Sequence, residues 1–435
     1  MRLTIVLFGL ALLLPIRGAW ADSLVIKNVY IHPVTSADIP KGQVLIVDGK
    51  IAEVGKKVSG RSAKVLDGGG LQLYPGMINA ATNIGLQEIG SVRDTVDLDE
   101  IGIFNPQLMA QMSFNPTSAH IGVTRAAGIT TVLSLPGTGG NGGALNGDEA
   151  VFSGQGALMH LDGWTWADMT VRSGAVLDMN FPEIRVVPER YAGGTAAAPM
   201  GFSALEREYR KRLDRIADFM EDARRYRKTK EAGNADFKPD PKLDAMIPVL
   251  TGSRRVLVRA ATERAIRDAV AFADREHVKI AIAFPREIGA TGPLLKSHDI
   301  PVVLGNTLEL PQHTDDAYDS SYTLPNQFFQ AGVKICFGTF DVQFARNLPF
   351  QAAAAVAFGL PRDEALKAVT ENAAEILGAG GELGSIEAGK TADLIFTDGD
   401  PLEATTTIKM EFIAGRQVTL ENRQTQLYEK YLNRQ

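Results

Sequence analysis

The segment that decides the fold reads Leu383-Gly-Ser-Ile-Glu-Ala-Gly-Lys-Thr-Ala-Asp-Leu-Ile-Phe-Thr-Asp-Gly-Asp-Pro401. Its second half predicts a strand over 392–397, because an apolar run lies there between turn-forming residues. Similar apolar runs predict strands at 408–413 and 417–420. A short polar helix is predicted over 422–431. The chain therefore ends in β-structure followed by one helix.

The N-terminal part has the same β-rich character, with predicted strands at 23–31, 43–47, 50–54 and 64–67. Asp48-Gly49 separates two of these strands, and Asp-Gly between apolar runs is typical of a type I′ hairpin turn. The ends of a compact chain often lie close together. We therefore predict one small β-sandwich domain built from 22–76 and 380–435.

Between these two parts, strands and helices alternate along the chain. The predicted elements are strands at 129–135, 256–258, 277–284, 302–304 and 333–337 and helices at 263–275 and 363–377. Such alternation implies a parallel sheet. A region of roughly 300 residues suits a closed barrel better than an open sheet. The expected fold class is thus α/β, with a TIM-like (β/α)8 barrel over 77–379.

One stretch of the barrel region, 203–242, has the composition of an insertion. Residues 205–231 are densely charged and predict an exposed helix, and the residues after it, 232–242, predict a loop. Acids and bases alternate along this helix, so opposite charges three or four residues apart can pair. This pattern favours a solvated helix over a basic helix that binds nucleic acid.

The first 21 residues predict an export signal. A short basic start precedes an apolar run, Leu3 to Pro15, and Ala19-Trp20-Ala21 supplies the small-x-small cleavage pattern. We therefore expect a periplasmic or otherwise exported protein that starts near Asp22, without a membrane anchor after cleavage. An uncleaved N-terminal anchor is the alternative, but the run is shorter than a typical membrane-spanning helix.

Composition excludes some functions. The chain has 435 residues and a formal net charge of −6, which becomes −8 once the two arginines of the signal are removed. Nucleic-acid binding needs clustered Lys and Arg, so nucleic acid is not an expected partner. Cys336 is the sole cysteine, which excludes an internal disulfide.

Three motifs together resemble the amidohydrolase superfamily, in particular its imidazolonepropionase-like and related metal-dependent branches. They are Tyr74-Pro-Gly-Met-Ile-Asn-Ala-Ala-Thr-Asn-Ile-Gly85, Ala365-Leu-Lys-Ala-Val-Thr-Glu-Asn-Ala-Ala-Glu-Ile-Leu-Gly378 and the opening segment 383–401. The resemblance implies a β-sandwich joined to a barrel. It also implies hydrolysis of an amide or cyclic amide C–N bond by zinc or another divalent metal, held where the barrel strands end.

The residues at the family's metal positions differ in this chain. The two histidines after the first barrel strand correspond to Ala81 and Asn83, and the histidine of the fifth strand corresponds to Arg259. The sixth strand ends in Phe284 without a histidine, and the acid of the eighth strand is shifted by one position to Asp341. Zinc prefers imidazole, thiolate and carboxylate ligands. We therefore expect no metal cofactor at these positions.

Five residues remain as candidates for a site. Asp341 is a candidate general base, and Arg259 is a candidate group to orient a carboxylate or stabilise an oxyanion. His160 is a third catalytic candidate, because His160-Leu-Asp162 is a His-x-acid pair near the expected start of the middle strands; its alternative is a structural histidine. Asn83 and His313 are candidate substrate-binding residues, His313 having a plain exposed loop as its alternative.

The sequence is compatible with three functions, and it does not decide whether the chain is an enzyme. The first is an amidohydrolase-like protein that is inactive or altered and binds a small-molecule ligand or a partner. It could form a homo-oligomer or pair with a related amidohydrolase. The second is an active C–N hydrolase with an atypical site that uses Asp341 and Arg259. The third is a scaffold that uses the charged helix at 205–231.

Overall fold

A computed structural model describes residues 23–60, 62–137, 150–184, 201–233, 237–311 and 315–434. The predicted export signal and His313 lie outside these ranges. Among the residues within them, no helix has both the length and the apolar content needed to cross a bilayer.

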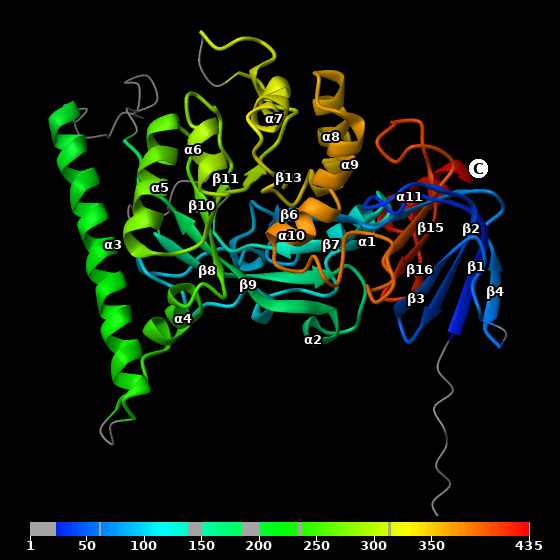
Figure 1. The fold of residues 1–435 in the computed structure, drawn as a ribbon, viewed down its shortest axis with the longest axis horizontal. Helices are drawn as coiled ribbons and strands as arrows, with labels where there is room; N and C mark the ends of the chain where they lie inside the picture. Colours follow the sequence, from blue (N-terminus) through cyan, green and yellow to red (C-terminus); the bar gives the residue numbers. More distant parts are fainter. Residues whose placement is uncertain are drawn as a thin grey trace, which may run out of the picture.

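Strands from both ends of the chain form one eight-stranded sheet, at one end of the molecule in Figure 1. The strands are β1 (Ser23–Ile31), β2 (Ile39–Val47), β3 (Lys50–Gly55), β4 (Lys64–Asp67), β5 (Gln72–Pro75), β14 (Leu394–Thr397), β15 (Ile408–Ile413) and β16 (Arg416–Val418). Their order is β16-β15-β14-β5-β1-β2-β3, with β4 paired to β1. The antiparallel β14–β5 ladder joins the two chain ends. The described strands form a single sheet here, so the second layer of a β-sandwich is not confirmed.

The hairpin between β2 and β3 follows the predicted turn. Val47 faces Lys50 across the ladder, and Asp48 and Gly49 have φ angles of 50° and 79°. Both positive values are what a type I′ turn requires. A side chain on Gly49 would meet the carbonyl oxygen of Ala414 at 2.7 Å, so this turn also packs against the turn after β15.

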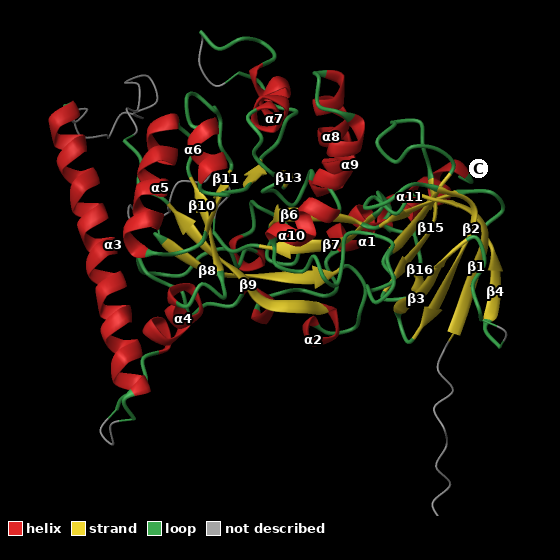
Figure 2. Cartoon of the chain, viewed as in Figure 1, coloured by secondary structure: helices red, strands yellow, loops and turns green. Residues whose placement is uncertain are grey.

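The second sheet also has eight strands and forms a nearly closed barrel (Figure 2). Its strands are β6 (Met77–Thr82), β7 (Ile129–Ser134), β8 (Phe152–His160), β9 (Thr170–Asn180), β10 (Arg255–Arg259), β11 (Ile280–Ala283), β12 (Val302–Leu304) and β13 (Ile335–Phe337), bonded in that order. The predicted all-parallel sheet is wrong at one strand, because β8 runs antiparallel to both β7 and β9. Its last residue, His160, therefore faces Thr131 near the start of β7.

The barrel closes between β6 and β13 through a seam of four hydrogen bonds. The Phe340 amide donates to the Ala81 carbonyl (2.8 Å). The Asn79 side chain donates to Thr339 Oγ1 (2.9 Å) and accepts from the Thr339 amide (3.1 Å). Thr82 Oγ1 donates to the Asp341 carbonyl (2.6 Å). Side chains contribute to three of these four bonds, which is why the sheet is closed without a continuous β6–β13 ladder.

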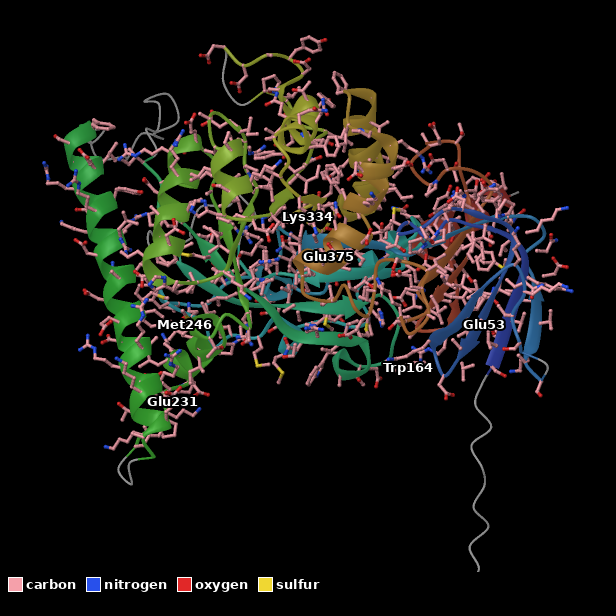
Figure 3. All side chains as sticks on the ribbon, in the orientation of Figure 1. Glu53, Trp164, Glu231, Met246, Lys334 and Glu375 are labelled. Carbon is pink, nitrogen blue, oxygen red and sulfur yellow. The ribbon has the colours of Figure 1, made fainter. Side chains whose placement is uncertain are left out.

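The helices lie around this barrel and beside the terminal sheet. They are α1 (Ala119–Arg125), α2 (Trp166–Met169), α3 (Phe202–Glu231), α4 (Pro241–Leu250), α5 (Glu263–Glu276), α6 (Gly292–Ser297), α7 (Ser320–Gln330), α8 (Leu348–Ala357), α9 (Arg362–Ala368), α10 (Glu371–Ile376) and α11 (Arg423–Leu432). Figure 3 shows Lys334, just before β13, beside Glu375 of α10; their charged groups lie 2.5 Å apart. This ion pair links a barrel strand to the helix behind it.

Two predicted helices differ from the structure. The charged insertion forms α3 along the flank of the barrel farthest from the terminal sheet (Figure 1). It is not fully exposed, because one face buries Tyr209, Ile216, Met220, Ala223 and Tyr226. The predicted helix 363–377 breaks into α9 and α10 at Thr370, whose φ of −135° is not helical. Its hydroxyl donates to the Leu366 carbonyl four residues earlier (2.6 Å), a bond that often bends a helix.

Candidate functional site

The mouth of the barrel, where the parallel strands end, holds a buried ion pair. On β10, Leu257 belongs to the barrel's interior core, so Arg259 two residues later points the same way. On β9, Val176 and Asp178 share that face by the same rule. Arg259 Nε lies 3.0 Å from Asp178 Oδ1, with side chains 10% and 0% exposed. A guanidinium with its own counter-ion therefore occupies the interior of the mouth.

Two aromatic rings continue this arrangement toward β11 and β12. The Arg259 guanidinium lies 5.6 Å from the centre of the Phe340 ring. The Phe340 ring meets the Phe284 ring edge-on, with centres 5.0 Å apart. The Arg286 guanidinium lies over the Phe284 ring, 4.1 Å from its centre. Cations over aromatic faces and edge-on ring pairs are favourable contacts, so these four side chains stabilise one another.

Asn83 lies at the same end of the barrel and is hydrogen-bonded to the backbone after β7. Its side-chain amide donates to the carbonyls of Leu135 (3.0 Å) and Gly137 (3.4 Å), and the residue is buried. Arg259 donates to the carbonyl of Pro136, between them, at 3.2 Å. The structure thus brings two candidate residues, Asn83 and Arg259, to one short segment after β7. The side-chain NH2 group of Asn83 is therefore hydrogen-bonded to backbone carbonyls.

Asp341 lies at the same end of the barrel but at the seam. Phe340 before it has a φ of 51°, which turns the chain after the end of β13. Asp341 Oδ1 accepts a hydrogen bond from the Phe344 amide (2.8 Å), and its carbonyl accepts from Thr82 and Thr339. Its carboxylate therefore caps the turn that leads into α8.

His160 lies at the other end of the barrel, because β8 is reversed. Its Nε2 lies 2.9 Å from Asp393 Oδ2, just before β14, and that carboxylate also accepts from the Ala414 amide. Burial alone would lower the pKa of His160, but the Asp393 carboxylate outweighs burial, so the pKa is raised above its usual value. His160 therefore links the barrel to the terminal sheet and is not near Arg259. His313, the fifth candidate, lies outside the described residues.

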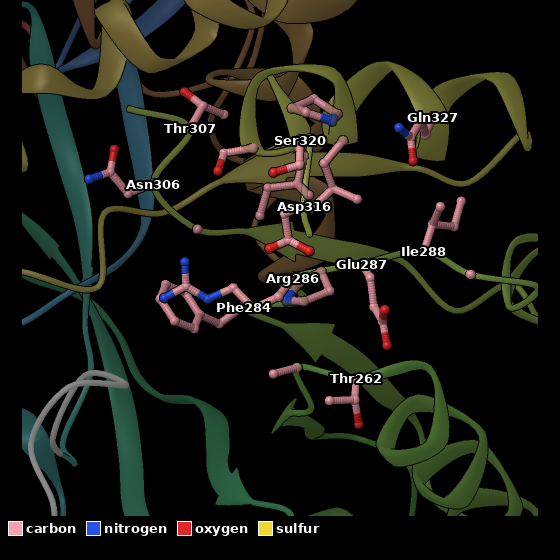
Figure 4. A pocket seen from close by; sticks show the side chains of 18 of the residues that line it. Thr262, Phe284, Arg286, Glu287, Ile288, Asn306, Thr307, Asp316, Ser320 and Gln327 are labelled. Carbon is pink, nitrogen blue, oxygen red and sulfur yellow. The ribbon is translucent and has the colours of Figure 1, made fainter. Parts of the chain in front are cut away.

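A cavity of about 540 Å³ opens beside this mouth (Figure 4). Its walls come from the ends of β10, β11 and β12 and from α7. Figure 4 shows Phe284 and Arg286 on one side, with Asp316 and Ser320 facing the same space. Leu304, Leu324 and Pro325 supply apolar surface. Concave sites of this size with a few convergent polar groups are where proteins usually bind small molecules.

Comparisons with known proteins agree with this architecture. The model of the amidohydrolase family matches residues 315–418. A crystal structure of an amidohydrolase from Thermotoga maritima MSB8 has a TM-score of 0.77 and 26% identity, covering 91% of this chain and 99% of that one. The chain is related to the amidohydrolase superfamily. The resemblance inferred from the three motifs is therefore confirmed.

The curated relatives of this amidohydrolase-like chain match it over a smaller share of their own length. The amidohydrolase tasK of Hapsidospora irregularis is 24% identical over 83% of this chain and 38% of its own length. The imidazolonepropionase of Thermoplasma volcanium is 34% identical over 22% of this chain and 25% of its own length. The chain thus spans well under half the length of the curated relatives that it matches.

The side chains at the family's metal positions do not fit a metal ion. The Ala81 side chain has no atom that could bind a metal, and Gly338 packs against it, because a Cβ added to Gly338 would lie 2.8 Å from the Ala81 backbone nitrogen. Asn83 donates to carbonyls, and Arg259 brings a positive charge into the space. Across the part of the chain that the structure describes, no group of three or more His, Cys, Asp or Glu side chains could hold an ion.

Sequence reasoning missed Asp178 as the partner of Arg259, and it missed the aromatic pair. A signal for Asp178 exists, since it is a single acid inside the apolar run Ala175-Val-Leu-Asp-Met179. Buried acids are almost always paired, so this pattern predicts a positively charged side chain on a neighbouring strand. No comparable signal marks Phe284 and Phe340, because phenylalanine is ordinary in a barrel.

Proposed function

We propose that this amidohydrolase-like protein binds a small organic molecule in the cavity between β11, β12 and α7, and that it does not use the family's metal centre. The observation that carries the proposal is the Arg259–Asp178 pair at the mouth. A neutralised guanidinium fills the space in which the family's ligands would converge, while a cavity of about 540 Å³ stays open beside it. The predicted export of the chain is part of the same proposal, with the binding taking place outside the cytoplasm.

Metal analysis tests the first half of the proposal. The purified full chain is dialysed against zinc or manganese, freed of excess ion and analysed by mass spectrometry. We expect less than one tenth of a metal ion per chain. A stoichiometric ion whose removal abolishes turnover of an amide would overturn the proposal.

Blocking the cavity tests the second half. Ser321 lines the cavity from α7, whereas Ser297 at the end of α6 is exposed and does not line it. The thermal shift caused by a small amide such as hexanamide is measured for wild type, Ser321→Trp and Ser297→Trp. We expect Ser321→Trp to lose the shift and Ser297→Trp to keep it. Equal shifts in the two variants would place binding elsewhere.

Hydrolysis of a C–N bond is the second candidate function. The similarity to the Thermotoga maritima amidohydrolase, which extends over nearly all of both chains, favours it. In this candidate Asp341 acts as the base and Arg259 orients the substrate. The Asp341→Asn variant tests the role of the base, with Asp363→Asn as the control, because Asp363 is exposed on α9 and does not line the cavity. Unchanged turnover in Asp341→Asn would remove Asp341 from any such mechanism.

A further inference from the structure

The Phe284 ring stands between the cavity and the barrel axis. The ring contacts both the Arg286 guanidinium, which lines the cavity, and the Phe340 ring, which packs in the barrel's interior core. Phe284 lines the cavity, whereas neither Phe340 nor Arg259 does. The ring is therefore the last side chain that a molecule in the cavity would meet before the axis.

The backbone holds this ring in place. Phe284 follows β11 with a φ of 57°, a conformation that side-chain-bearing residues rarely adopt. Its amide donates to the Val303 carbonyl (2.9 Å), which fixes the residue to β12. The ring lies against the α-carbon of Gly305, where an added Cβ would come within 2.3 Å of Phe284 Cδ2. Gly305 is thus the residue that makes room for the ring.

We infer that Phe284 is a specificity-determining residue, the wall that limits how deep a ligand reaches into the cavity. This inference rests on the proposed small-molecule site. A ligand with a polar head near the hydroxyls of α7 and an apolar tail directed at β11 ends at the Phe284 ring. Removing the ring joins the cavity to the space beside Phe340, so longer apolar tails become accommodated.

A homologous series of probes tests this wall. Butyramide, hexanamide and octanamide share one polar head and differ only in tail length. Burial of each additional methylene raises affinity about fourfold, so two methylenes raise it about fifteenfold. Binding of each amide is measured by calorimetry with the full chain as wild type, Phe284→Ala and Leu324→Ala. Leu324→Ala is the matched control, because it also enlarges the cavity with a smaller apolar residue but lies on α7.

We expect affinity to stop rising along the series in wild type and in Leu324→Ala, and to rise about fifteenfold between hexanamide and octanamide in Phe284→Ala. If Phe284→Ala does not fold, Phe284→Leu is expected to give a smaller gain of the same sign. The same plateau in all variants would refute the role of Phe284 alone. Binding of no amide by any folded variant would refute the cavity proposal, and with it this inference.

Discussion

The buried pair at the barrel mouth gives the sharpest prediction about this chain. The perturbation is a double-mutant cycle of Asp178→Asn, Arg259→Met and the combination. Asp178 is fully buried and Arg259 nearly so, which means that either single change leaves a charge in the protein interior without its main partner. Breaking a buried pair in this way destabilises by about 3–5 kcal/mol. The double variant leaves no such charge.

The expected magnitudes follow from that difference. Each single variant loses about 3–5 kcal/mol of unfolding free energy, a large part of the roughly 5–15 kcal/mol typical of a folded protein. Replacing both partners by uncharged groups is often close to neutral, so the double variant recovers most of the loss. The Pro136 carbonyl, which Arg259 also contacts, limits this recovery. We therefore expect a coupling energy of at least about 2 kcal/mol.

Urea unfolding followed by circular dichroism measures all four proteins. Equal slopes of the transitions ensure that the comparison concerns stability and not the unfolded state. Losses in the single variants that simply add in the double variant would refute the reasoning. So would single losses below about 1 kcal/mol, since these are typical of exposed ion pairs.

Three further predictions concern other parts of the chain. The pKa of His160 is raised in the folded state, so the stability from its pair with Asp393 is full below the unfolded pKa of about 6.5 and is lost as pH rises through the folded pKa. The urea midpoint of His160→Gln should therefore depend less on pH than that of wild type between pH 6 and 9, and an unchanged pH profile would contradict this. Glu411 is completely buried, neither of its carboxylate oxygens has a hydrogen-bond partner in the structure, and burial raises its pKa well above the usual value. The stability linked to Glu411 is therefore present at low pH and is lost as pH rises. Urea unfolding should show Glu411→Gln to be more stable than wild type at pH 8 but not at pH 4, and a destabilised variant at pH 8 would refute this. Export predicts that the secreted chain begins at Asp22, which mass spectrometry of the intact protein from the cell envelope checks; retention of residues 1–21 would contradict cleavage.

The sequence was sufficient for the α/β barrel and for the pairing of the two chain ends, because both depend on local patterns, whereas the second layer of the predicted β-sandwich is not confirmed. Asp48-Gly49 predicted its turn, since only a few residue types adopt two consecutive positive φ angles. The motif at 383–401 identified the family, and the β14–β5 ladder shows how that segment joins the chain ends. The direction of β8 was not predictable in this way. An apolar strand reads the same in both directions, and its partners decide how it runs.

Two residues at the barrel mouth, Arg259 and Asn83, were named from the sequence, but their partners and their arrangement were not predictable. Arg259 and Asn83 were named from the positions that they occupy in the family motif, and they do meet at the segment after β7. His160 was named for its neighbour Asp162, yet its partner is Asp393, far along the chain. Contacts between residues distant in sequence depend on strand order and direction. The cavity beside β11 likewise depends on where α7 lies over the barrel.

The seam between β6 and β13 has a consequence for how this barrel can change. In a barrel closed by a continuous ladder, the closing bonds join main-chain atoms, so ordinary substitutions leave them in place. Here Asn79, Thr82 and Thr339 supply most of the closing bonds through their side chains. A single change such as Asn79→Leu therefore removes two of the bonds that close the barrel between β6 and β13 and leaves the hydrogen bonds between the other strands in place. Closure in this protein is encoded in side chains and is open to selection one residue at a time.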